Sequence, residues 1–129
     1  MERPRLLLID DEPALAAFVA NAAGLCGYSA QVATHYLQFR EEFLANRPNM
    51  VALDLGMPGM DGVELIRFLA EEGYRSPVLI ISGFDRRVLE SAFRLGQALG
   101  LMMAGPLEKP VRLEELETLL NQLRPTLVL

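Results

Sequence analysis

The stretch from residue 6 to residue 14, "LLLIDDEPA", contains the pattern that decides the fold. Four apolar residues run directly into two adjacent carboxylates, Asp10 and Asp11. Pro13 follows, at a place where the first turn of a helix tolerates proline. The pattern predicts a buried strand over residues 5–9, followed by a turn into a helix. Burial and mutual repulsion disfavour both ionised carboxylates unless a cation or a set of hydrogen-bond donors lies beside them.

The same alternation of strand and helix continues along the chain. Five rounds of it, with strands apolar enough to be covered on both faces, predict an α/β fold with a parallel sheet flanked by helices. Expected strands lie at 5–9, 28–32, 76–83 and 101–105, and another begins at residue 50 and runs into a Gly and Pro loop. Expected helices lie at 13–26, 36–45, 63–73, 86–100 and 112–123.

Composition and charge exclude several classes of protein. The 129 residues, 51% of them hydrophobic, suit one domain. The net charge of −5 argues against a nucleic-acid partner. The apolar runs are too short to span a membrane, and the N-terminus turns acidic too soon for a secretory signal, so we expect a cytoplasmic protein. Cys26, the only cysteine, permits no internal disulfide and is interpreted as a small buried hydrophobe.

Polar side chains follow four of the expected strands. Asp10 and Asp11 follow the first, Asp54 the third, Ser82 the fourth and Lys109 the fifth. Ligands of open parallel sheets gather at the carboxyl ends of the strands. Oxygen ligands without His or Cys suit Mg²⁺. With that cation bound, Asp54 could remain ionised and attack a phosphoryl group whose oxygens contact Lys109 and Ser82.

Each of these residues has an ordinary structural alternative. Asp10 or Asp11 could cap the following helix, and Asp54 could be a turn residue. Ser82 could be a turn or capping hydroxyl, and an isolated lysine such as Lys109 is usually a solvated surface charge. Their conjunction at four strand ends favours a common site.

Four motifs carry a resemblance to a known family. They are "LLLIDDEP" at 6–13, "LDLGMPGMDG" at 53–62, "ISG" at 81–83 and "EKP" at 108–110. Over nearly the whole chain, the sequence resembles the receiver domain of bacterial two-component response regulators, of chemotaxis type. The resemblance implies a flavodoxin-like, doubly wound (βα)5 fold, with a receiver domain at 1–124 and a C-terminal tail at 125–129.

The resemblance also implies a role for each site residue. Asp54 would be the phosphoacceptor. Asp11, Asp54 and the backbone carbonyl of Gly56 would bind Mg²⁺, with Asp10 acting largely through water. The family usually has a cis bond before the proline at position 110, which would help to aim the lysine inward. Contacts to the phosphoryl group are implied for two residues, Ser82 and Lys109.

Partners follow from the same resemblance. A sensor histidine kinase or a phosphotransfer protein would present phosphohistidine, and the phosphorylated face would bind an output domain or protein through the fourth helix, the fifth strand and the fifth helix. A second copy of the chain is another expected partner. Residues 98–110 are also similar to receivers attached to cyclic-di-GMP phosphodiesterase domains. The chain would be a signalling protein that catalyses only its own phosphorylation and dephosphorylation.

Two positions depart from the family. Receivers commonly have Tyr or Phe three residues before the lysine, where a rotating ring helps to signal, but this chain has Pro106. Phe84 stands where some receivers have a polar side chain that orients the hydrolytic water, and it is equally compatible with a packing role. Phosphorylation is therefore expected to be read out without the usual aromatic switch.

Other function classes fit the sequence less well. An aspartate-nucleophile phosphatase needs a second Asp two residues after the nucleophile, where this chain has Gly56. A receiver that only binds and never accepts phosphate usually lacks an acidic residue or the lysine, and all are present here. A dinucleotide-binding domain would show a G-x-G-x-x-G motif, which the sequence lacks.

Overall fold

The computed structural model describes residues 3–55, 62–83 and 86–127. Strands and helices alternate along this part of the chain, as the sequence predicts. The strands are β1 (Arg5–Ile9), β2 (Ser29–Ala33), β3 (Met50–Asp54), β4 (Pro77–Ser82) and β5 (Met102–Glu108). The helices are α1 (Pro13–Leu25), α2 (Tyr36–Ala45), α3 (Gly62–Glu71), α4 (Arg86–Ala98) and α5 (Leu113–Leu123), with a 3-10 turn, η1, at Arg124–Thr126.

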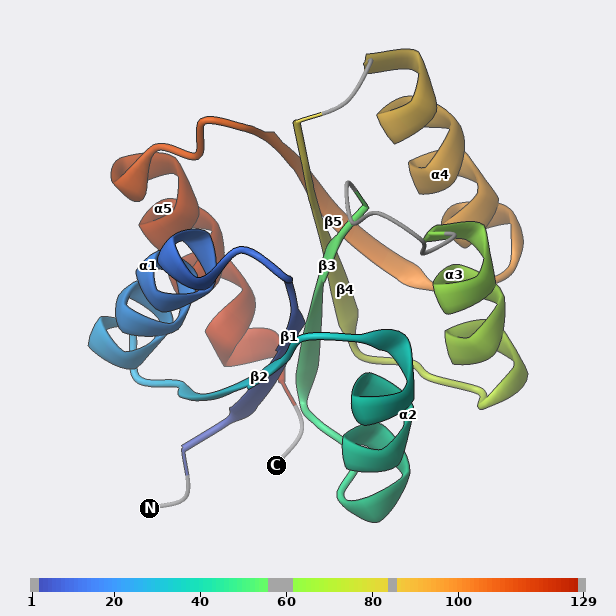
Figure 1. Cartoon of the computed structure of the whole chain (residues 1–129), viewed down its shortest axis with the longest axis horizontal. Helices are drawn as coiled ribbons and strands as arrows, with labels where there is room; N and C mark the ends of the chain where they lie inside the picture. The colour runs from blue at the N-terminus through green and yellow to red at the C-terminus, as the bar shows by residue number, and fades with distance from the viewer. Residues whose placement is uncertain (1–2, 56–61, 84–85, 128–129) are drawn as a thin grey trace.

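The five strands form one parallel sheet in the order β2-β1-β3-β4-β5. Helices α1 and α5 cover one face, and α2, α3 and α4 cover the other (Figure 1). The predicted doubly wound α/β fold is confirmed. Strand β1 lies between β2 and β3, so the order of connections reverses beside it, which is where ligands bind in such sheets.

The central strands are buried on both faces. Successive side chains of a strand point to opposite sides, so β1 contributes Leu6 and Leu8 to the layer under α1 and α5. Leu7 and Ile9 enter the layer under α2, α3 and α4. Strand β3 divides its side chains in the same way. The near-continuous apolar runs of the sequence therefore reflect a sheet that is covered by helices on both sides.

Strand β5 differs from its sequence prediction. The strand expected from the sequence ends at Gly105, but β5 continues to Glu108. Between the pairs Leu79↔Ala104 and Ile81↔Leu107, β5 has one residue more than β4, so the strand contains a bulge at Gly105 and Pro106. Gly105 has φ +85°, and β5 is an edge strand, where a residue without an N–H is tolerated.

The end of the described chain packs against the molecule. The guanidinium of Arg124 in η1 lies over Gly27, where an added β-carbon would be 2.8 Å from Nε. Leu127 packs against the core layer beneath α1 and α5. Among the described residues, no helix is both long enough and apolar enough to cross a membrane.

Candidate functional site

Strand register brings the predicted site residues together. Ile9 of β1 pairs with Leu53 of β3, so the next residues along the two strands, Asp10 and Asp54, lie side by side. Ser82 ends β4 and pairs with Glu108 of β5, which places Lys109 directly beyond it. All four positions thus meet at the carboxyl edge of the sheet.

Lys109 connects the buried and exposed parts of this edge. Its Nζ lies 3.1 Å from Oδ2 of Asp54, whose side chain is 1% exposed, and 3.1 Å from Oε1 of Glu12, whose side chain is 62% exposed. Burial works against the ammonium, but its hydrogen bonds and attraction to both carboxylates prevail, so the pKa of Lys109 is raised. The ammonium is held between two negative groups.

Asp10 lies beneath this ion pair and is itself buried, with 2% exposed. Its Oδ1 accepts a hydrogen bond of 2.9 Å from the backbone N–H of Glu12. The pKa of Asp10 is raised to about 6, chiefly by burial and also by the nearby charge of Asp54, while the hydrogen bond from the N–H of Glu12 acts in the opposite direction. Asp10 and Asp54 are two buried carboxylates beside a single ammonium, so this cluster keeps a negative charge that a further cation would neutralise.

The carboxylates of this edge fit a divalent cation. Oxygen atoms of Asp10, Asp11 and Asp54, one from each residue, all lie within 4.8 Å of one another. Hard oxygen ligands of this kind are the ones that Mg²⁺ takes. The predicted backbone ligand, Gly56, lies outside the described residues.

The ordinary alternatives for the first two carboxylates are not what the structure shows. Glu12, rather than Asp10 or Asp11, is the N-cap residue of α1, and its side chain makes no capping hydrogen bond. Pro13 begins the helix, as predicted.

The far side of the site is built by β4 and β5. Ser82 is 1% exposed, and its carbonyl accepts a 2.9 Å hydrogen bond from the N–H of Lys109. A β-carbon added to Gly83 would lie 3.2 Å from Cδ of Lys109, so the lysine stem passes directly over this glycine. The bond between Lys109 and Pro110 is cis, as the resemblance implies, and the Gly105–Pro106 bond is also cis.

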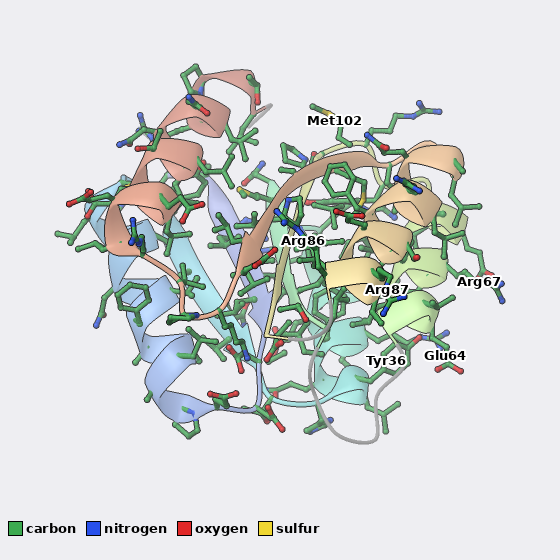
Figure 2. The ribbon with its side chains drawn as sticks, turned by 90° about the horizontal axis from the view of Figure 1, so that it is seen from above. Tyr36, Glu64, Arg67, Arg86, Arg87 and Met102 are labelled. Atoms are coloured by element: carbon green, nitrogen blue, oxygen red, sulfur yellow. The ribbon has the colours of Figure 1, made fainter. Side chains whose placement is uncertain are left out.

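Pro106 lies in the bulge of β5. Together with Gly105 it borders a shallow hollow against α5, whose walls include Thr118 and Leu119. Arg86 stands at the start of α4 (Figure 2). Its Nε lies 3.2 Å from Oε1 of Glu108 at the end of β5. The other departure from the family, Phe84, lies outside the described residues.

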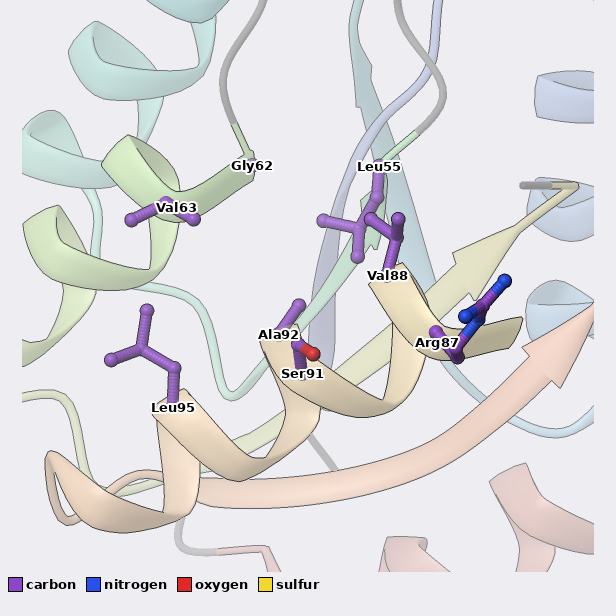
Figure 3. Close-up of a pocket in the computed structure, with 8 residues that line it drawn as sticks. All are labelled: Leu55, Gly62, Val63, Arg87, Val88, Ser91, Ala92 and Leu95. Atoms are coloured by element: carbon purple, nitrogen blue, oxygen red, sulfur yellow. The ribbon is translucent and has the colours of Figure 1, made fainter. Parts of the chain in front are cut away.

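A separate groove opens between α3 and α4, directly after Asp54. Its cavity has a volume of about 430 Å³ and is mostly apolar (Figure 3). The residues that line it are Leu55, Gly62, Val63, Arg87, Val88, Ser91, Ala92 and Leu95. The groove contains none of the clustered carboxylates, so the candidate chemistry lies at the sheet edge and not here.

Comparison with known sequences identifies the family. A sequence model of the response regulator receiver domain matches residues 6–121. The chain belongs to this family. The receiver domain is 30% identical over 115 residues to the response regulator MprA of Mycobacterium sp. (strain KMS), covering 87% of this chain and 46% of MprA. It is 38% identical over 80 residues to the nitrogen assimilation regulatory protein NtrX of Azorhizobium caulinodans, covering 60% of this chain and 18% of NtrX.

Solved structures agree with this assignment. A response regulator from Colwellia psychrerythraea superposes with a TM-score of 0.77 at 30% identity, over 97% of this receiver domain and 99% of that chain. The chemotaxis protein CheY4 of Vibrio cholerae has the same fold, with a TM-score of 0.80 at 20% identity, over 95% of this chain and 99% of CheY4. The receiver domain spans less than half the length of the curated relatives named above. The match to the family model over residues 6–121 makes this chain a receiver domain of two-component signalling.

One residue of the site was not predicted from sequence. Glu12 contacts Lys109 with its side chain and Asp10 with its backbone N–H. The available signal was its place as the third acid of the run that follows the first strand. Only the fold shows that this third carboxylate faces the lysine of a strand end 97 residues away.

Proposed function

We propose that this receiver domain accepts a phosphoryl group on Asp54 in a Mg²⁺-dependent reaction, and that the modification changes its binding to an output partner. The observation that carries the proposal is the ion pair of the buried Asp54 with Lys109, beside two more carboxylates at the same strand edge. A buried carboxylate that is kept in contact with an ammonium is suited to act as a nucleophile.

The chemistry is a displacement at phosphorus. A carboxylate oxygen of Asp54 forms the new O–P bond, and the P–N bond of the donor phosphohistidine breaks, with its electron pair remaining on the imidazole. Lys109 and Ser82 hold the oxygens of the transferred group. Bound Mg²⁺, held by Asp10, Asp11 and Asp54 with the carbonyl of Gly56, would supply positive charge that stabilises the transferred oxygens. Hydrolysis of the acyl phosphate restores Asp54.

The partners are proposed from the family. A sensor histidine kinase or a phosphotransfer protein in the cytoplasm donates the phosphoryl group, and the face formed by α4, β5 and α5 binds an output domain, an output protein or a second copy of the chain. Residues 1–124 form the receiver domain and residues 125–129 its tail. We assign the output no chemistry beyond the similarity of residues 98–110 to receivers of cyclic-di-GMP phosphodiesterases.

The readout must use a route other than a rotating ring. Pro106 has no side chain that can turn about χ1, and it sits in a bulge of the edge strand. Arg86 provides an alternative connection, because it joins the start of α4 to Glu108, the residue before Lys109. We propose that movement at the end of β4 and the start of α4 transmits the signal, since switching requires an element whose contacts differ between the two states.

Phosphorylation can be tested with a small donor. The wild type is incubated with acetyl phosphate, with Mg²⁺ or with EDTA, and its intact mass is measured beside that of Asp54→Asn. We expect one phosphoryl group on the wild type with Mg²⁺ only, and none on the variant, because the amide is nearly isosteric but cannot act as the nucleophile. Absence of phosphorylation in every sample would instead favour a receiver that only binds partners.

A further inference from the structure

We propose that Glu12 is a positioning residue for Lys109. Its carboxylate holds the ammonium at the mouth of the site, so that the ammonium can release Asp54 and donate a hydrogen bond to an incoming phosphoryl oxygen instead. The proposal rests on the proposed function and adds a residue to its site. Its basis is the pair of equal contacts, 3.1 Å each, that the ammonium makes with Asp54 and Glu12.

The two carboxylates have different surroundings. Asp54 lies in the buried floor of the site, whereas Glu12 stands at the rim, with 62% of its side chain exposed. Among the described residues, the group of carboxylates close enough to share a metal ion is Asp10, Asp11 and Asp54, without Glu12. Glu12 is therefore directed at the ammonium and not at the candidate cation.

The position of Glu12 is fixed by its backbone. Its N–H donates to Asp10 and its carbonyl accepts the first hydrogen bond of α1, from the N–H of Ala16 at 2.9 Å. The residue thus joins β1, α1 and β5 at one point. Its side chain needs only to reach outward to meet Lys109, whose stem lies against Gly83.

The chemistry of an ammonium explains how the exchange would work. Lys109 has three N–H donors on a flexible stem, and its contacts with Asp54 and Glu12 use two of them. The donor that points at Asp54 becomes available when that carboxylate is phosphorylated, while the contact with Glu12 persists. Without Glu12, nothing among the described residues would hold the ammonium at the rim. The hollow beside it, formed largely by apolar residues of α1 and by Pro110 and Val111, offers no second carboxylate.

The sequence makes this contact easy to measure. Of the 12 Lys and Arg residues, Lys109 is the only lysine, so protein labelled with ¹⁵N-lysine gives one assigned side-chain ammonium signal. The variants are Glu12→Ala, which removes the contact, and Glu12→Gln, which removes the charge but keeps an oxygen acceptor. Glu41→Ala is the matched control, because it removes an exposed charge from the outer surface of α2.

Phosphorylation by acetyl phosphate is measured at saturating Mg²⁺, so that a change in Mg²⁺ affinity does not enter. We expect Glu12→Ala to slow the maximal rate about tenfold, because one charge-assisted hydrogen bond is lost. The rate of Glu12→Gln should stay within about threefold of the wild-type rate, and the rate of Glu41→Ala should be unchanged. The ammonium signal should exchange faster with solvent in Glu12→Ala and stay protected in Glu12→Gln.

Three results would overturn the proposal. Faster phosphorylation in both Glu12 variants would show that the carboxylate merely repels the anionic donor. Equal slowing in both would show that charge alone matters, and wild-type rates with an unchanged ammonium signal in Glu12→Ala would show that the contact does nothing. If the wild type itself accepts no phosphoryl group, the proposed function fails, whereas the ammonium signal still decides whether Glu12 holds Lys109.

Discussion

Replacing Asp10 by Asn should stabilise the cation-free receiver domain at neutral pH. The carboxyl group of Asp10 is buried beside Asp54, and its pKa of about 6 lies well above the ordinary value of 3.8. That difference corresponds to about 3 kcal/mol of unfavourable free energy for the ionised form in the folded protein. Asn has nearly the same shape, and its side-chain oxygen can still accept the N–H of Glu12.

The sign of the pH dependence follows from the raised pKa. The folded protein holds this proton more tightly than the unfolded chain does, so the contribution of Asp10 to stability is fully present below about pH 4 and is lost as the pH rises through about 6. The Asp10→Asn variant has no carboxyl group that ionises at this position, so it does not lose stability in this way as the pH rises. At about pH 7.5 we expect it to be more stable than wild type by roughly 1 to 3 kcal/mol, because burial of the amide offsets part of the gain.

Urea unfolding followed by far-UV circular dichroism, in EDTA, provides the assay, since the chain has no Trp. Unfolding is measured from about pH 4 to pH 8 for the wild type, Asp10→Asn and the control Asp11→Asn, whose carboxylate is exposed. The control should change stability much less. Added Mg²⁺ should stabilise the wild type more than Asp10→Asn. If Asp10→Asn were the less stable protein at pH 7.5, or if its advantage grew on acidification, the electrostatic reasoning would be wrong.

Three further predictions concern packing and the signalling route. Gly83→Val should slow phosphorylation by acetyl phosphate about tenfold at unchanged Mg²⁺ affinity, because a side chain there displaces the stem of Lys109; an unchanged rate would contradict this geometry. Gly96→Ala should lower the free energy of unfolding by about 1 kcal/mol, although alanine has the better helix propensity, because the new β-carbon would overlap Sδ of Met103. Urea unfolding measures this loss, and the loss should be absent when Met103 is also replaced by Ala. Pro106→Tyr should leave phosphorylation within about twofold of wild type, because the residue lies in the bulge of β5 and not at the carboxyl edge of the sheet. Hydrogen exchange with beryllofluoride should still change in α4, and changes confined to β5 would contradict the proposed route.

The fold was predictable because its signals are local. Buried strands such as β1 and β3 appear as apolar runs, each ending in a carboxylate, and Pro13 marks the start of a helix. The convergence of Asp10 and Asp54 followed from one general property of parallel sheets, namely that their carboxyl ends share an edge. The boundaries of β1 agree with the structure to the residue, and β3 begins at the predicted residue, Met50.

The features that sequence reasoning missed depend on contacts between distant segments. Strand β5 continues through Gly105 and Pro106 because it pairs with β4 on one side only, and no local pattern distinguishes such a bulge from a strand end. The contact between Glu12 and Lys109 joins residues 97 positions apart. Both side chains are long enough to reach many partners, so the sequence alone does not identify this pair.

Chemical identification of the phosphorylated residue decides whether Asp54 is the phosphoacceptor. The receiver domain is phosphorylated with acetyl phosphate and Mg²⁺ and then treated with borohydride, which reduces an aspartyl phosphate to homoserine, and the digested peptides are sequenced by mass spectrometry. We expect homoserine at position 54 in wild type, none in the EDTA sample, and none at any position in Asp54→Asn. Homoserine at Asp10 or Asp11 with an unmodified Asp54 would contradict this expectation.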